Sequence, residues 1–388
     1  MDSCPTEILL QIASFLPSED DLQNLRLVGR RLCDAATQYA FLKLVVFDHA
    51  CSVRRFIGLL ECEDQRILHV VENVVFNGLQ TDHYALGADP TLPLLTHALS
   101  LIHRLPKLHS LRLDFMPDED NPTIPAEGGH TFNSYYLQVQ LACIRGLTSN
   151  PLPLPRLRTL HLGSLHGYIP HELQTDAFFT LFRPLTHLSI RVQSLLHRVN
   201  LPDEVSLFDE TLSRIFENTP HLTSLELASA SLEGPCSVFR FEDFRIPSLR
   251  SLSVRGFVLA GQDDGHPIPA SVVERGTPLA LETFILNHAH MLRRLEMHDC
   301  VVALPNGSWD NVFRRIRLRL TQLVEFVWIA QPAEEMNCTV LYAGFDFNER
   351  VNPAMRYAIR HDIMDFEGVQ KVQLEMLQEA VLSRSSTR

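Results

Sequence analysis

The first forty residues carry apolar side chains at the spacing of an amphipathic helix. Four of them lie one, four, seven and eight positions after Ile8, which places the whole set on one helix face: Ile8, Leu9, Ile12, Phe15 and Leu16. Pro5 suits the first turn of this helix, because its missing N–H costs nothing there. Pro17 is expected to end the helix.

Two more helices are predicted before residue 41. Ser18 and Asp21 have the spacing of a helix N-terminal cap, with acidic residues in the first turn. The helix that they open carries an apolar stripe made of Leu22, Leu25 and Val28. Gly29 is expected to interrupt it. A third short helix is expected to carry Leu32, Ala35 and Ala36.

So short a segment cannot bury this much apolar surface by itself. Two interpretations follow from the pattern alone. The three helices are either a cap over the rest of the chain or a docking module for another protein. Composition by itself favours the cap.

A second pattern, Pro-x-Leu-x-x-Leu-x-Leu, recurs along the chain. Complete copies begin at Pro106, Pro155, Pro220 and Pro247, the last with valine in the final position. Weaker copies are Leu185-Leu188-Ile190, Leu292-Leu295-Met297 and Leu323-Phe326-Trp328, and Val71-Val74-Phe76 is a candidate first copy. The last two apolar positions of each copy are two residues apart, as in a strand with one buried face.

Segments with helical spacing lie between these copies. They are Val53/Phe56/Ile57/Leu60, Leu95/Ala98/Leu99/Ile102/Leu105, Leu212/Ile215/Phe216 and Val312/Ile316/Leu320. A strand and a helix that alternate in this way predict an α/β solenoid with parallel strands. The alternative is an α/β domain that is not a true solenoid.

The spacing of the copies is irregular, so long insertions are expected. Four segments rich in proline, glycine or aspartate are the candidate loops: 114–134, 163–174, 228–246 and 256–270. After residue 330 the pattern stops. Residues 340–347 predict a strand, and Val369, Val372, Met376 and Ala380 predict a helix stripe that caps the last repeat.

Charge and cysteine content restrict the partners and the compartment. The formal net charge is -12, so the chain repels phosphate backbones and anionic lipids, and we expect neither a nucleic acid nor a membrane as a partner. No apolar run reaches the roughly 20 residues that span a bilayer. The eight cysteines form no C-x-x-C pair, which is typical of reduced thiols in the cytoplasm or nucleus.

Motifs of catalysis are absent from the sequence. It contains no G-x-S-x-G, P-loop or G-x-G-x-x-G motif. His161, His166 and His171 lie five residues apart, which suits neither one helix face nor one strand face. The arginines at 314, 315, 317 and 319 are expected to form a solvated helix face. We therefore expect no catalytic residue, no metal and no cofactor.

The N-terminal helices resemble the F-box. The matching residues are Pro5-Thr6-Glu7-Ile8-Leu9-Leu10-Gln11-Ile12, Phe15-Leu16, Asp21-Leu22, Leu25-Arg26-Leu27-Val28 and Arg31. The resemblance implies a three-helix module that binds the Skp adaptor and, through it, a cullin. The adaptor-facing residues that it implies by position are Pro5, Ile8, Leu9, Ile12, Leu16, Leu22, Leu25 and Val28.

Three positions depart from the family pattern. Cys4 stands where leucine is usual, Gly29 replaces a cysteine, and Leu32 stands where tryptophan is common. These departures affect the expected tightness of adaptor binding.

The remainder resembles the degenerate leucine-rich repeats that follow F-boxes in fungal proteins. The fold class implied is α/β, with a three-helix F-box over 1–42, an irregular leucine-rich-repeat-like solenoid over 43–330, a capping segment over 331–382 and a disordered tail over 383–388. Such a solenoid would bind a protein substrate on its outward strand positions. The candidate residues are Arg112, His161, Arg191, Glu226, Arg255, Glu296 and His298, with Ser189 and Ser253 beside them.

The function that this resemblance implies is substrate recognition. The chain would be a non-catalytic subunit of a cullin-type ubiquitin ligase that holds a protein substrate near the ubiquitin-charged enzyme. The alternative is a non-catalytic repeat scaffold whose N-terminal helices are only a structural cap. An unrecognised hydrolase has no motif in its favour.

Overall fold

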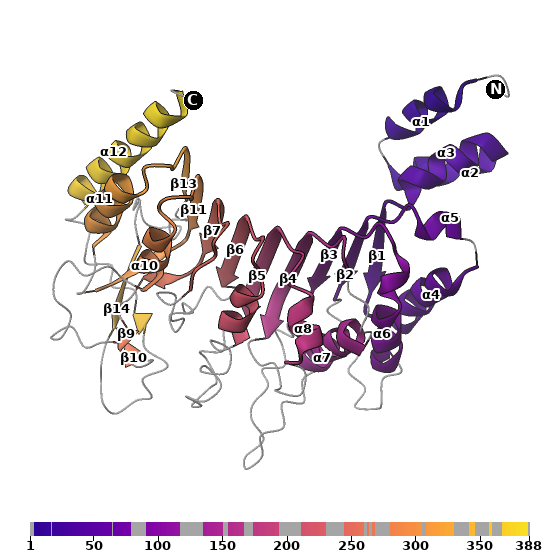
Figure 1. Cartoon of the computed structure of the whole chain (residues 1–388), viewed down its shortest axis with the longest axis horizontal. Helices are drawn as coiled ribbons and strands as arrows, with labels where there is room; N and C mark the ends of the chain where they lie inside the picture. The colour runs from indigo at the N-terminus through magenta and orange to yellow at the C-terminus, as the bar shows by residue number, and fades with distance from the viewer. Residues whose placement is uncertain are drawn as a thin grey trace, which may run out of the picture. The chain divides into compact units, whose positions relative to one another are not determined.

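The structure is a computed structural model of the chain (Figure 1). It describes residues 4–16, 18–63, 65–78, 91–116, 135–149, 154–166, 174–193, 211–229, 244–259, 262–263, 266–267, 280–304, 308–329, 341–345, 357–358 and 367–386. The chain divides into two compact units, Met1–His161 and Leu162–Arg388. Pro17, His171, much of the predicted loops and most of 331–366 lie outside the described residues.

The first unit begins with the three predicted helices. They are α1 (Thr6–Ser14), α2 (Glu19–Val28) and α3 (Arg30–Ala40). Pro5 is the N-cap of α1, and Gly29 separates α2 from α3 with an extended backbone. The Ser18 hydroxyl accepts a hydrogen bond from the Asp21 N–H at 3.1 Å, which confirms the predicted cap of α2.

Small side chains let these helices approach one another. One buried cluster is made of Ala13, Leu22, Ala36 and Ala40. A second is made of Leu9, Leu32 and Ala35. The residues that pack against both clusters also fall between positions 4 and 41, so the helices form a core of their own.

Parallel strands in chain order form the main sheet. Its order is β1-β2-β3-β4-β5-β6-β7-β11-β13. The strands are β1 (Lys43–Phe47), β2 (Asn73–Asn77), β3 (Ser110–Asp114), β4 (Thr159–His166), β5 (His187–Gln193), β6 (Ser224–Ser229), β7 (Ser251–Arg255), β11 (Arg294–His298) and β13 (Glu325–Ile329). The pairs β1–β2, β2–β3, β5–β6, β6–β7, β7–β11 and β11–β13 are parallel. The α/β class with parallel strands is confirmed.

The repeat motif sets the register of these strands. All three apolar positions are buried in the four complete copies, as with Leu249, Leu252 and Val254. The same position aligns across neighbouring strands, which joins Leu188, Leu225, Leu252, Leu295 and Phe326. In the copy at Leu323 the two strand positions, Phe326 and Trp328, are only half-buried, because β13 is the last strand of the sheet.

A shared hydrogen-bond pattern marks each repeat. Two successive N–H groups at the start of a strand donate to one carbonyl of the preceding repeat. Arg250 and Ser251 bond Thr223 at 2.8 and 2.9 Å, and Arg293 and Arg294 bond Arg250 at 2.7 and 3.0 Å. Glu72 and Asn73 bond Leu42 in the same way, at 3.0 and 2.9 Å, which identifies β1 as a copy that the sequence pattern missed. Phe41 takes its leading position in place of leucine.

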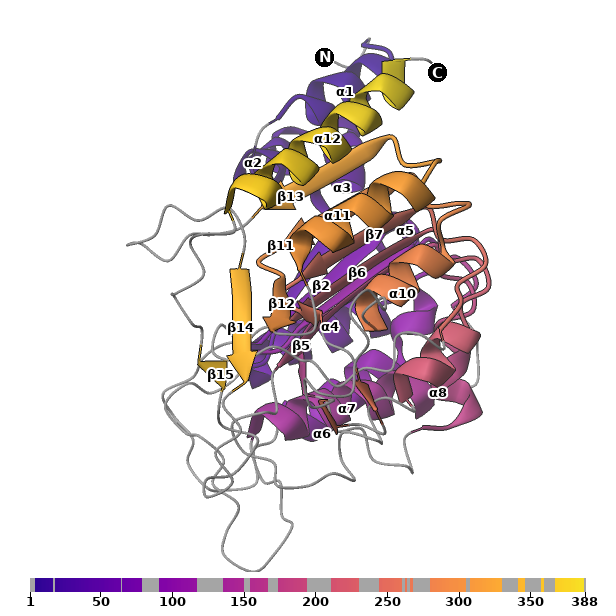
Figure 2. The same ribbon diagram turned by 90° about the vertical axis from the view of Figure 1, so that its left-hand side faces the viewer.

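Helices connect the strands of the first unit. They are α4 (Ala50–Glu61), α5 (Gln65–Leu68), α6 (Thr91–Ser100), the 3₁₀ turn η1 (Ile102–Arg104) and α7 (Tyr135–Ser149). The predicted faces of α4 and α6 are buried, whereas α7 was not predicted. Figure 2 shows α6 and α7 side by side. Gly146 permits this approach, because a Cβ there would lie 2.6 Å from the Thr96 carbonyl oxygen.

The second unit has α8 (Asp176–Thr180), a helix over residues 211–217, α10 (Ala280–Asn287), α11 (Trp309–Arg319) and α12 (Glu367–Ser386). The predicted apolar faces of the 211–217 helix and of α11 are buried. The solvated arginine face expected on α11 is wrong in one respect. Arg315 donates to the fully buried Glu282, with Nη2 2.8 Å from Oε2. A buried carboxylate needs such a partner.

A second sheet lies in the same unit, in the order β15-β14-β12-β8. Its strands are β8 (Val258–Leu259), β12 (Val301–Leu304), β14 (Leu341–Phe345) and β15 (Tyr357–Ala358), and β9 (Gln262–Asp263) pairs with β10 (His266–Pro267). The strand predicted over 340–347 is confirmed. The candidate loop 256–270 contains three strands of two residues each, β8, β9 and β10.

The C-terminal helix α12 packs against α11 and β13 (Figure 1). Arg384 donates to the carbonyls of Leu320 and Arg317 at 2.8 and 2.9 Å and so satisfies the C-terminal end of α11. The buried face is Gln370, Leu374, Leu377 and Val381, and the predicted stripe is corrected because Val372 and Met376 are exposed. The helix includes residues 383–386, for which we expected disorder.

The other predicted domain boundaries stay predictions. Among the described residues, no helix is both long and apolar enough to cross a membrane.

Candidate functional site

Apolar side chains are exposed on α1 and α2. Phe15 is 76% exposed, Leu27 86% and Val28 66%, and Ile8 and Ile12 are a little under half exposed. Such side chains are normally scattered singly over a protein surface. Here they fall within 21 consecutive positions of a module that already has its own core. They form a set that we call the N-terminal apolar surface: Ile8, Ile12, Phe15, Leu27 and Val28.

The structure divides the eight residues predicted to face an adaptor. Pro5, Ile8, Ile12 and Val28 are exposed, and Leu16 and Leu25 are half-buried. Leu9 and Leu22 are buried in the core of the module, at 2% and 8% exposure. The prediction that Leu9 and Leu22 contact an adaptor stays untested. Both belong to the core clusters of the module. Phe15 and Leu27 are exposed apolar residues that the sequence-based site omitted.

Helical periodicity explains this division. Leu9 and Ala13 lie four residues apart and face α3, while Ile8 and Ile12 form the adjacent row of α1. Both rows are apolar in sequence, so the pattern alone does not distinguish them. On α2, Arg26 is held by Gln23 and Thr37 at 2.8 and 3.2 Å and lies over the Phe41 ring. Leu27 and Val28, the next two residues of α2, belong to neither core cluster.

The second candidate surface is the outward face of the strands. In the first unit it carries Arg112 and Asp114 on β3 and His161 on β4. The Arg112 guanidinium donates to one oxygen of Asp114, and His161 Nε2 lies 3.1 Å from the other. Two predicted site residues are thus brought together by a carboxylate that was not predicted.

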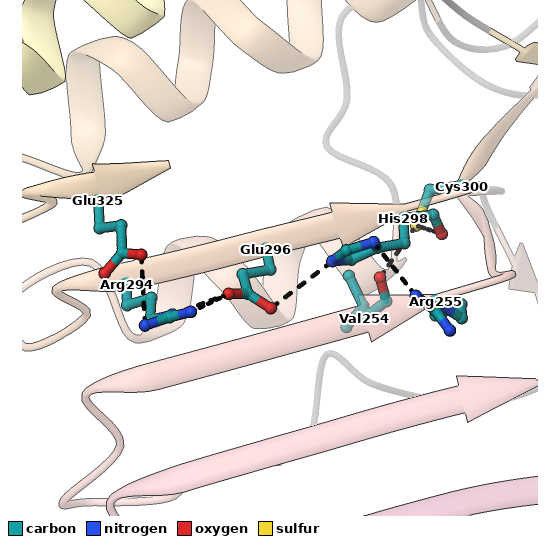
Figure 3. A network of polar contacts seen from close by, with 7 residues as sticks. All are labelled: Val254, Arg255, Arg294, Glu296, His298, Cys300 and Glu325. Carbon is teal, nitrogen blue, oxygen red and sulfur yellow. Dashed lines mark hydrogen bonds and ion pairs between the residues drawn. The ribbon is translucent and has the colours of Figure 1, made fainter. Parts of the chain in front are cut away.

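In the second unit a polar network joins β7, β11 and β13 (Figure 3). Arg294 donates from Nε to Glu296 at 2.8 Å, and its Nη1 lies 3.3 Å from Glu325. His298 Nε2 lies 3.6 Å from Glu296, and Arg255 Nη2 lies 3.4 Å from His298 Nδ1. A guanidinium can only donate, so Nδ1 accepts and the ring proton is on Nε2, toward Glu296. Three predicted site residues, Arg255, Glu296 and His298, therefore form one network.

Two of the three carboxylates in these networks, Asp114 and Glu296, are held in the charged form. Partial burial raises the pKa of Asp114, but hydrogen bonds from His161 and Arg112 outweigh it, so the net pKa lies below its ordinary value. Glu296 behaves alike. Burial raises its pKa, but Arg294, Ser253 and His298 lower it by more, so the net pKa lies below its ordinary value. Both carboxylates are therefore negatively charged near neutral pH.

The remaining predicted residues, Arg191 and Glu226, are also exposed on outward strand positions. The register pairs Glu226 with Ser189 and Ser253, and it pairs Ala228 with Arg191 and Arg255. The face therefore carries its charges in rows that cross the strands.

The described residues contain no group of three or more His, Cys, Asp or Glu side chains able to hold a metal. Burial raises the pKa of the Cys300 thiol to about 12 and that of Cys143 well above its ordinary value, which makes both poor nucleophiles.

His288 has a structural role. Its Nδ1 lies 2.7 Å from the Phe284 carbonyl, and its Nε2 accepts from the Ile246 N–H at 2.8 Å. Desolvation lowers its pKa, so the ring stays neutral and both nitrogens are used.

Comparisons with known proteins give no family. No family model matches the sequence, and no curated protein matches it. A solved structure that resembles the chain is the crystal structure of the Rad7 and Elc1 complex in yeast, with 14% sequence identity, a TM-score of 0.24 and coverage of 87% of this chain and 91% of that chain. At this TM-score the likeness indicates neither fold nor function.

Proposed function

We propose that this protein is a non-catalytic substrate-recognition subunit of a Skp–cullin–F-box ubiquitin ligase. The helices α1–α3 bind the Skp adaptor and, through it, the cullin. The outward face of the parallel strands binds a protein substrate. The gain in rate comes from holding the substrate near the ubiquitin-charged enzyme, which raises its effective concentration.

The observation that carries the proposal is the N-terminal apolar surface. Leaving five large apolar side chains in water is unfavourable, by up to roughly 25 cal/mol for each Å² that a partner could cover. They belong to neither core cluster of the module, which alanines and leucines fill. A partner surface is the simplest reason for these side chains.

The test is retention of the purified full chain on immobilised Skp adaptor. The double variant Ile8→Asp plus Ile12→Asp places two charges on the surface and leaves Leu9 and Ala13 in the core. We expect wild type to bind and the double variant to bind at least about tenfold more weakly, because both side chains lose their apolar contact.

Leu318→Asp is the matched control, since Leu318 is 63% exposed on α11 in the other unit. This variant should bind the adaptor as wild type does. No binding by wild type, or equal binding by the double variant, would contradict the proposal.

The alternative, a repeat scaffold with a helical cap, predicts a different arrangement of apolar contacts. A cap buries its apolar face on the part that it covers. Here the core clusters of α1–α3 draw their members from residues 4–41 alone, and part of the apolar set is exposed. Removing residues 1–40 separates the two hypotheses, because loss of folding in the remainder supports the cap and retention of folding supports docking.

A further inference from the structure

One part of the outward strand face in the second unit has its charges unneutralised. On β11, Arg294 contacts two carboxylates, and Glu296 contacts both Arg294 and His298. On β5 and β6 the situation differs. Among the described residues, neither Arg191 nor Glu226 has an ion pair or hydrogen bond from its side chain. Arg255 uses one of its five N–H groups, toward His298.

Strand register places these three residues around one backbone position, Ala228 on β6. Arg191 on β5 and Arg255 on β7 both pair with Ala228 on β6. Strands lie about 4.8 Å apart, so the two arginine backbones are separated by roughly 10 Å. Between them stands only a methyl group, and Ala228 is itself buried. The β6 position between the two arginines therefore carries no long side chain.

Glu226 lies two residues before Ala228 on the same strand. Alternate residues of a strand share a face and are roughly 7 Å apart. The face thus offers one negatively charged residue and, roughly 7 Å further along the strand direction, two positively charged residues. An extended peptide has the same spacing between its own alternate side chains.

We propose that this face binds an extended peptide segment with a basic and an acidic residue two positions apart. The acidic side chain sits between Arg191 and Arg255, and the basic side chain sits over Glu226. This inference rests on the proposed substrate role of the strand face and defines the substrate class.

Charge selects this ligand over a purely acidic one. An acidic residue at the second position would lie against Glu226, and the net charge of -12 opposes a polyanion. A purely basic segment would meet Arg191 and Arg255. Only alternate residues of opposite sign match both rows.

The test is selection from a random peptide display library on the immobilised full chain. We expect enrichment of peptides that carry Lys or Arg two positions from Asp or Glu, in either order. The variant Glu226→Arg places a third positive charge beside Arg191 and Arg255 and should enrich two acidic residues at the same spacing. A reversal of this kind is not produced by general loss of folding.

Single variants sharpen the result. Arg191→Gln and Arg255→Gln should each weaken binding of an enriched peptide up to about fivefold, the range for one exposed charge pair. Arg250→Gln is the matched control, since Arg250 is exposed just before β7, and it should have no effect. No charge enrichment, or the same motif on the Glu226→Arg variant, would overturn the inference.

The adaptor plays no part in this selection. Failure here with intact adaptor binding would remove the peptide specificity alone. Failure of adaptor binding with an enriched motif would remove the ligase role and leave the peptide site.

Discussion

The N-terminal helices and the outward strand face of the second unit expose opposite kinds of side chain. On α1 and α2 the exposed set is apolar and lies over a core of alanines and leucines. On β5, β6, β7 and β11 the set is charged, and the part on β11 is paired along that strand and with Arg255 on β7 (Figure 3). Both sets stand on regular secondary structure, and both belong to amphipathic elements.

The difference suggests different tasks. An apolar surface gains most of its binding energy from burial and tolerates variation in the partner. A charged array gives little net affinity but rejects partners of the wrong charge. A receptor that always binds one adaptor and must choose its substrate needs one surface of each kind. The following expectations test whether the two surfaces differ in this way.

The largest expected effect is a difference in stability between a core substitution and a surface substitution in the N-terminal helices. Leu9→Ala empties a buried position and should destabilise α1–α3 by about 2–4 kcal/mol. Ile8→Ala, at the neighbouring exposed position, should change stability by less than about 0.5 kcal/mol. Hydrogen exchange of residues 6–40 measures both. Equal loss of protection in the two variants would show that Ile8 is a core residue.

A smaller effect is expected from salt. Raising NaCl from 50 to 500 mM should weaken binding of the charge-alternating peptide by about threefold to fivefold, because exposed charges are screened. Adaptor binding should change by less than about twofold, since it depends on apolar burial. Titrations at both salt concentrations measure this. A stronger salt dependence of adaptor binding than of peptide binding would contradict the proposed difference between the two surfaces.

The smallest effect concerns acid. Because the folded-state pKa of Glu296 lies below its ordinary value of 4.5, its contribution is complete above that pH and is lost as the pH falls through the folded pKa. Glu296→Gln should cost about 0.5 kcal/mol at pH 7, given the partial exposure of the network. It should also flatten the fall in stability below about pH 4.5, measured by thermal unfolding. An unchanged acid slope would mean that the network adds nothing.

Periodicity predicted most of the regular elements. The α1–α3 pattern, the faces of α4, α6 and α11, and the strand copies from Val71 to Trp328 were all visible as apolar spacing. It failed where the spacing is ambiguous. The α7 helix is buried on several sides, so it has no single stripe. The stripe of α12 was misplaced because Val372 and Met376 are apolar but exposed.

The site was predicted only as candidates. The alternation of apolar and polar positions placed Arg112, His161, Arg255, Glu296 and His298 on the outward face. It did not predict which of them touch. Those contacts depend on register between strands whose copies are up to 49 residues apart in sequence, as from Leu111 to Leu160. Glu282 and Arg315 illustrate the same limit, since each stands on an ordinary helix and only packing makes them a buried pair.

The sequence by itself determined the elements and their inward faces, because burial repeats with the period of a helix or a strand. Tertiary structure decided which of two apolar rows on α1 faces inward and which charges meet on the sheet. Both depend on neighbours from distant segments, and local periodicity contains no information about such neighbours.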